Sequence, residues 1–147
     1  MTLALTARRE SPAKWVLPFL AAQIVGAILG VWLAHLMFDL PILQASTKAR
    51  TGIGQWAAEA TATFGLVLLI LIGVRKAPER LPAAVSVYIV GAYWFTASTS
   101  FANPAVTIAR ALSNTFAGIA PADAPAFIVA QMAGALLAWL TARYLDR

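Results

Sequence analysis

The sequence predicts an all-α integral membrane protein, a bundle of spanning helices with an internal inverted repeat. Its 147 residues are 61% hydrophobic and 12% charged, and the mean hydropathy is +0.76. Soluble domains carry roughly twice that share of charge, so one soluble core of this length would not hide so much apolar surface. Four apolar runs have about the length that a spanning helix needs, at 15–38, 55–74, 82–98 and 125–144.

The first run is not a cleavable signal peptide, although basic residues precede it. It covers 15–38, whereas the apolar core of a signal peptide has only about 7–15 residues. The run therefore predicts a spanning helix.

The distribution of charge predicts the orientation of the spans. Eight basic residues fall on one side of the predicted membrane, namely Arg8, Arg9, Lys14, Arg75, Lys76, Arg80, Arg143 and Arg147. Lys48 and Arg50 fall on the other side. By the positive-inside rule, the sequence predicts a multi-pass protein of the inner cell membrane with both ends of this chain cytoplasmic.

Composition also excludes several classes of function. The chain has no cysteine and one histidine, which rules out disulfides, thiol chemistry and a histidine metal cluster. The net charge of +5 is spread over the ends of apolar runs and does not indicate nucleic-acid binding. No acid–base pair, nucleophile or phosphate-binding loop is present. We expect no enzyme activity, cofactor or metal, and a lipid bilayer as the main partner.

An internal repeat supports an inverted topology. "AAQIVGAILGVWLA" (21–34) aligns with "VAQMAGALLAWLTA" (129–142), and upstream "TLALTAR" (2–8) resembles "TIARALS" (107–113). An odd number of predicted spans separates the two units, so they lie in opposite orientations, as in many channels and transporters.

The segment "NPAVTIARAL" (103–112) predicts a half-helix that begins inside the membrane. Pro104 suits the first turn of a helix and Asn103 suits its N-cap. Such a terminus, with an asparagine amide beside it, donates to neutral hydroxylated solutes and disfavours cations. A chance loop turn is the alternative, and the repeat argues against it.

These residues resemble the C-terminal part of the aquaporin, or major intrinsic protein, family: the third to sixth spans with the second signature loop, Asn103, Pro104 and Ala105. Glu59 matches the family's glutamate early in the fourth span. The resemblance implies one partial, N-terminally truncated aquaporin-like domain over 1–147, with four spans and one complete re-entrant half-helix. Residues 1–14 correspond to the remnant of a first half-helix and a basic cytoplasmic loop, and 99–124 to the second loop.

The beginning of the sequence departs from the family pattern. Met1 stands where the family has the valine after the first Asn-Pro-Ala. A start codon assigned too late and a truncated gene are the two explanations, and we expect the chain alone not to conduct.

The resemblance implies that Gly91, Ser100 and Val106 belong to the selectivity filter, with a fourth position outside this sequence. Val106 stands where the family usually has arginine, which implies a wide, neutral filter, similar to that of bacterial members associated with arsenic resistance. We expect a passive channel for glycerol-like polyols, metalloid hydroxides such as arsenous acid, and water. The family also implies a homotetramer for the full-length protein.

Three other polar residues have alternative interpretations. For Glu59 the resemblance implies a structural role in holding loop backbone, and proton coupling is the alternative. Arg110 follows Val106 by one helical turn; we expect it to cap or pair near the end of the half-helix, and a substitute filter arginine is the alternative. His35 is expected to be a solvated interfacial residue, with gating as the alternative.

Two other functions remain open from the sequence. One is a four-span proton-coupled exporter with Glu59 as its coupling acid, which would leave the half-helix without a role. The other is a fragment that does not conduct.

Overall fold

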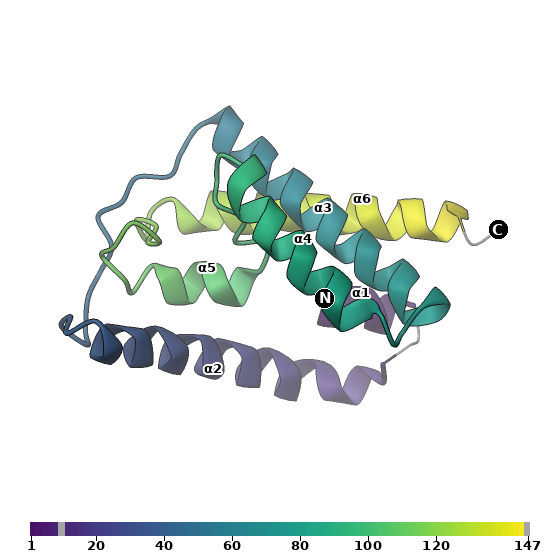
Figure 1. Cartoon of the computed structure of the whole chain (residues 1–147), viewed down its shortest axis with the longest axis horizontal. Helices are drawn as coiled ribbons and strands as arrows, with labels where there is room; N and C mark the ends of the chain where they lie inside the picture. Colours follow the sequence, from purple (N-terminus) through teal and green to yellow (C-terminus); the bar gives the residue numbers. More distant parts are fainter. Residues whose placement is uncertain (9–10, 146–147) are drawn as a thin grey trace.

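The computed structural model describes residues 1–8 and 11–145, and all regular secondary structure in these residues is helical, as predicted. Arg9 and Arg147 of the predicted basic set lie outside the described residues. The elements in chain order are α1 (Thr2–Ala7), η1 (Ala13–Trp15), α2 (Val16–Met37), α3 (Ile53–Lys76), α4 (Leu81–Phe95), α5 (Pro104–Arg110) and α6 (Ala124–Leu145) (Figure 1).

Three of the four predicted spans are helices long and apolar enough to cross a membrane: α2, α3 and α6. The remaining predicted span, at 82–98, corresponds to α4, which has only 15 residues and is shorter than that run. The chain leaves the helix at Thr96, which is extended, and Thr96 Oγ1 donates to the Ala92 carbonyl at 2.6 Å. The polar residues after Phe95 therefore form a loop and do not extend the span.

The helices α3 and α6 form the tightest pair in the fold. Gly134 lies so close to the carbonyl of Ala60 that a Cβ atom would collide with it. Val67 and Leu71 of α3 pack with Ala138 of α6 in one apolar cluster. The glycine therefore permits backbone contact between two long helices.

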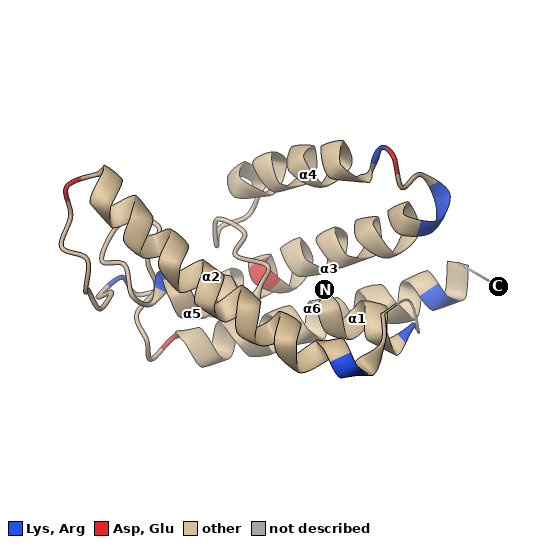
Figure 2. Ribbon diagram, turned by 90° about the horizontal axis from the view of Figure 1, so that it is seen from below, with Lys and Arg blue, Asp and Glu red and all other residues tan. Residues whose placement is uncertain are grey.

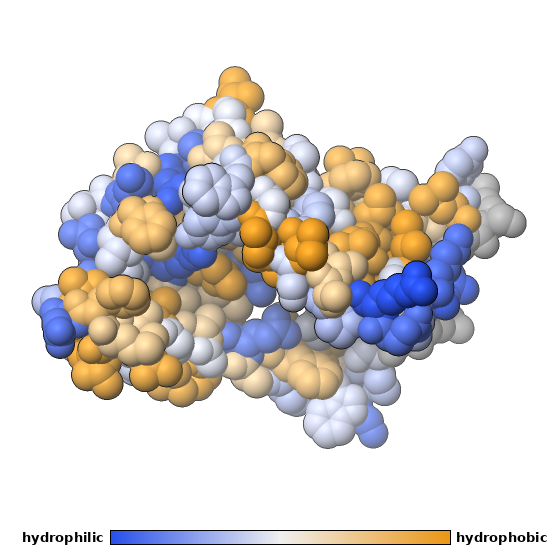
Figure 3. All heavy atoms as spheres, in the orientation of Figure 1, coloured by the Kyte–Doolittle hydropathy of each residue, from blue (hydrophilic) through white to orange (hydrophobic). Residues whose placement is uncertain are grey.

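The helix α2 lies apart from this pair. Figure 1 shows α2 along one side of the molecule, with α5 between α2 and α6. The described part of α2 buries only His35, and its exposed apolar residues include Leu17, Val25, Leu29 and Leu33. Figure 3 shows hydrophobic patches, in orange, interspersed with hydrophilic residues on one face of the molecule. This surface suits lipid or further helices.

Charged residues concentrate at helix ends and in connecting segments (Figure 2). In the turn between α3 and α4, Arg80 and Glu79 are both largely exposed. The apolar middles of the long helices are consistent with a membrane environment.

Candidate functional site

The site is built around the beginning of α5. This helix begins at Pro104, and the Oδ1 atom of Asn103 accepts from the backbone N–H of Ala105 at 2.9 Å. The predicted cap and first-turn proline are therefore confirmed. Among the described residues, the Nδ2 group of Asn103 has no acceptor, so its hydrogens remain available to a solute oxygen.

The loop before Asn103 has an unusual backbone. Thr99, Ser100 and Ala102 have φ values of 60°, 47° and 49°. This left-handed region favours glycine, and each such residue costs on the order of 1–3 kcal/mol, so it persists only where its surroundings hold it there. A strong set of contacts must therefore fix the loop.

Glu59 provides those contacts. Its Oε1 accepts from the Phe101 N–H at 2.8 Å, and its Oε2 accepts from the Ala102 N–H at 2.9 Å. Gln131 of α6 donates to Oε2 at 2.7 Å, and the Glu59 side chain is 0% exposed. A carboxylate that accepts three hydrogen bonds is suited to holding the strained loop against α3 and α6.

The two repeat units make the same hydrogen bond. Gln23 donates to the Thr2 hydroxyl at 2.8 Å, and Gln131 donates to the Thr107 hydroxyl at 2.8 Å. The pairs occupy the aligned positions of the repeat, so the structure confirms the alignment in detail. Both bonds tie the first turn of a short helix to a long helix.

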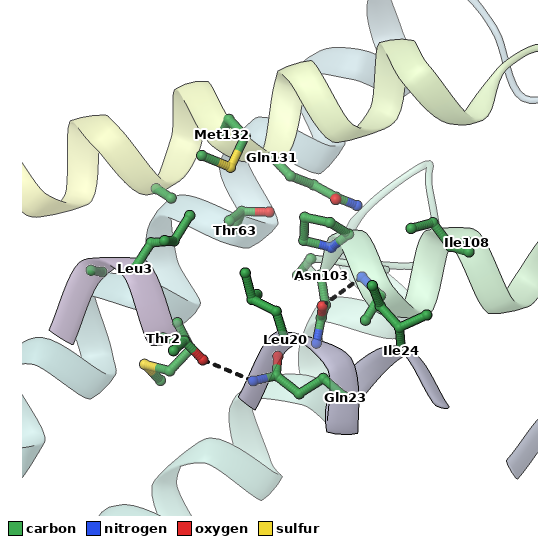
Figure 4. Close-up of a pocket in the computed structure, with 16 residues that line it drawn as sticks. Thr2, Leu3, Leu20, Gln23, Ile24, Thr63, Asn103, Ile108, Gln131 and Met132 are labelled. Carbon is green, nitrogen blue, oxygen red and sulfur yellow. Dashed lines mark hydrogen bonds between the residues drawn. The ribbon is translucent and has the colours of Figure 1, made fainter. Parts of the chain in front are cut away.

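A small cavity of about 120 Å³ lies where these parts meet. Figure 4 shows Thr2 and Gln23 on one side of it, Gln131 on another and Asn103 at the beginning of α5. The rest of the lining is mostly apolar and includes Leu20, Ile24, Ile108 and Met132. A few polar groups in an apolar cavity are typical of a site for a small neutral molecule.

The three predicted filter residues do not line this cavity. Ser100 is buried in the strained loop, and Val106 packs against the apolar cluster that contains Phe101. Gly91 lies in α4, where a Cβ atom would contact the Phe95 ring at ordinary distance.

His35 is not solvated, so that prediction is wrong. Its side chain is 2% exposed, with Nδ1 3.0 Å from the Ile42 carbonyl and Nε2 3.0 Å from the Ser113 hydroxyl. The chain turns back after α2 through Asp39, whose φ is 53°, and this turn returns Ile42 to the histidine.

Arg110 stacks on aromatic rings. Its guanidinium carbon lies 4.3 Å from the centroid of Phe101 and 5.8 Å from that of Tyr93. Arg110 also lines a second cavity of about 470 Å³, together with His35 and Phe116. The structure therefore places this charge beside the loop that carries Ser100.

Arg50 is a residue whose importance the sequence did not reveal. Its side chain donates from Nε to the Gly118 carbonyl (2.7 Å), from Nη1 to that of Ser98 (3.1 Å) and from Nη2 to that of Phe116 (2.8 Å). Arg50 is 6% exposed, and burial lowers the pKa of its guanidinium, with the charge of Arg110 adding to that effect. The only sequence signal was a basic residue in a loop on the side with few charges.

Across residues 1–8 and 11–145, His, Cys, Asp and Glu side chains form no group of three that could hold a metal ion.

Comparison with known proteins gives one strong similarity. Over 127 residues the chain is 55% identical to the aquaglyceroporin AqpS of Rhizobium meliloti (strain 1021). The match covers 86% of this chain and 54% of AqpS, so the chain spans about half the length of this curated relative. No protein-family model and no solved structure matches the chain.

Proposed function

Because the chain is homologous to part of an aquaglyceroporin and so belongs to the aquaporin, or major intrinsic protein, family, we propose that it forms part of a passive channel for small neutral solutes. Aquaglyceroporins are membrane channels and not enzymes. The chain is a multi-pass membrane protein, and its contacts are with lipid and with solute.

The observation that carries this proposal is the small cavity at the beginning of α5. The Asn103 amide and the Thr2–Gln23 pair border it, and its remaining wall is mostly apolar. A solute that carries hydroxyl groups finds donors there, while a cation finds no carboxylate among the lining residues to replace its water. Neutral solutes are therefore favoured.

We further propose that Gly91, Ser100 and Val106 contribute to the filter. Val106 leaves more room than an arginine at the same position, and Gly91 adds no side chain. Neither residue adds a charge to the filter. Solutes of glycerol size and neutral metalloid hydroxides such as arsenous acid fit this expectation, and water passes with them. AqpS is named an aquaglyceroporin, which is consistent with the passage of water and glycerol.

The orientation and the assembly belong to the same proposal. The protein lies in the inner cell membrane with both ends of this chain on the cytoplasmic side, as the positive-inside rule predicts. The complete channel is a homotetramer, as the resemblance implies.

A proton-coupled exporter fits less well. Glu59 would be its coupling acid, but its two oxygens already accept from Phe101, Ala102 and Gln131 in a fully buried position. Protonation of this carboxyl would release the strained loop, which is a poor basis for a transport cycle.

The test is solute uptake into lipid vesicles. One preparation contains this chain alone, and the other contains the chain joined to the part of AqpS that the match leaves uncovered. We expect background permeability for the first, and glycerol and arsenous acid flux for the second that depends only on the solute gradient. Flux that requires a proton gradient would favour the exporter, and background flux from both preparations would contradict the proposed channel.

A further inference from the structure

The filter position of the proposed channel has no charge of its own, but two guanidinium groups lie next to its loop. Val106 stands where the family usually has arginine. Arg110 lies 4.3 Å and Arg50 lies 5.1 Å from the same ring centroid, that of Phe101. Phe101 follows Ser100 directly, so both charges lie beside the proposed filter loop.

These two charges come from different parts of the chain. Arg110 ends the short helix α5, one helical turn beyond Val106. Arg50 belongs to the segment between α2 and α3, and its Nη1 holds the carbonyl of Ser98, two residues before Ser100. The local sequence around the filter therefore does not reveal that they meet.

Neither charge is neutralised by a direct ion pair. Within residues 1–8 and 11–145, the side chains of Arg50 and Arg110 form no salt bridge with a carboxylate. Glu59 accepts three hydrogen bonds from neutral N–H groups and Asp123 accepts from the backbone N–H of Arg50. The charge of Glu59 acts on both guanidinium groups, but it is one negative charge against two positive ones. Aromatic faces and carbonyl oxygens hold the guanidinium groups, and these direct partners are neutral, so they do not cancel the positive charge.

The cavity of about 470 Å³ lies on the same side of the loop. Arg110 lines it directly, and Arg50 donates to the carbonyl of Phe116, another lining residue. In a site with little water, a positive charge acts over a longer distance than in bulk solvent.

We infer that Arg50 and Arg110, held beside Phe101, supply the positive potential that keeps cations out of the filter. This inference rests on the proposed channel and adds specificity residues to it. A neutral solute passes such a potential freely, whereas a cation meets repulsion in addition to the loss of its water. Val106 then widens the filter without removing the barrier to cations.

The absence of native cysteines allows a direct measurement of this potential. Val106→Cys introduces a single thiol, which is treated with methanethiosulfonate reagents that carry a sulfonate, a trimethylammonium group or no charge. The ratio of the sulfonate rate to the trimethylammonium rate reports the local potential, because the thiolate fraction cancels. The same ratio for 2-mercaptoethanol in solution is the reference.

We expect the ratio at Val106→Cys to exceed the reference by about tenfold or more, since Arg110 lies one helical turn away and Arg50 lies beside the same loop. Adding Arg110→Gln should lower the ratio by about tenfold, while Arg110→Lys should preserve it. Arg50→Gln should also lower it. Arg143→Gln is the matched control, because Arg143 also stacks on a ring, that of Trp139 at 5.3 Å, in the last turn of α6.

Three results would overturn the inference. The first is a ratio at the single variant Val106→Cys that equals the reference. The second is an equal change of that ratio in Arg110→Gln and Arg143→Gln, and the third is a Cys thiol that the uncharged reagent does not modify. The measurement needs no transport, so it is separable from the vesicle assay: a high ratio without solute flux would reject the channel and leave the charge assignment standing. If Arg110→Gln unfolds the chain, the comparison of Arg50→Gln with Arg143→Gln still decides, and equal changes in these two would overturn the inference.

Discussion

The two repeat units, α1 with α2 and α5 with α6, share a sequence pattern but differ in how completely they are built. In each, a glutamine donates at 2.8 Å to a threonine in the first turn of the short helix. In the second unit, Gln131 also donates to Glu59 and is 1% exposed. In the first unit, Gln23 is only half-buried, and its Nε2 bonds Thr2 alone among the described residues.

The difference between the two glutamines shows which hydrogen bonds the repeat sequence specifies and which ones need residues outside the repeat. The threonine–glutamine bond needs only one short helix and one long helix, so it forms in both units. The buried network of the second unit also needs the carboxylate of α3 and the strained loop before Asn103. The repeat sequence alone contains neither, so we expect the two units to differ in stability although their sequence patterns match.

The largest expected effect breaks the second unit. Glu59→Ala removes the acceptor of three buried hydrogen bonds and leaves their donors without partners, which should cost about 3 kcal/mol or more of the free energy of unfolding. Thermal unfolding in detergent measures this loss. Glu79→Ala, in an exposed turn, is the control, and an equal shift for both would show that Glu59 does not hold the loop.

The next pair compares the aligned glycines. A Cβ at Gly134 would collide with the carbonyl of Ala60, so Gly134→Ala should destabilise the chain by about 2 kcal/mol. At Gly26 nothing lies within 4 Å, so Gly26→Ala should stabilise the helix by up to about 1 kcal/mol. Unfolding midpoints should therefore move in opposite directions, and shifts of the same sign would contradict the comparison.

The smallest effect concerns the aligned glutamines. Gln131→Ala should cost about 1–2 kcal/mol, because it removes buried bonds to Glu59 and Thr107. Gln23→Ala should cost about 0.5 kcal/mol, because its single bond is half-exposed. Equal losses in the same unfolding assay would mean that the two networks are equivalent.

Features that depend on residues adjacent in the sequence could be predicted. The half-helix, its Asn103 cap and its first-turn proline follow from local rules, and the ends of α2 and α6 lie within a residue or so of the predicted runs. The aligned threonine–glutamine pairs follow from the repeat.

Features that depend on distant contacts were not predictable. Arg50 binds three carbonyls from segments 48–68 residues away, and no local pattern marks such partners. His35 is buried by a turn whose geometry depends on Asp39. The helix α4 ends at Phe95, and the residues that follow form the loop that Glu59 of α3 holds by hydrogen bonds.

The most direct test of the proposed channel changes its filter. In the complemented protein described above, Val106→Arg restores a large charged donor, and glycerol and water permeabilities are measured on the same vesicles. We expect glycerol permeability to fall by about tenfold and water permeability to fall much less, because the narrower opening excludes the larger solute first. An equal loss for both solutes in a folded protein, or no change for either, would contradict a filter at Val106.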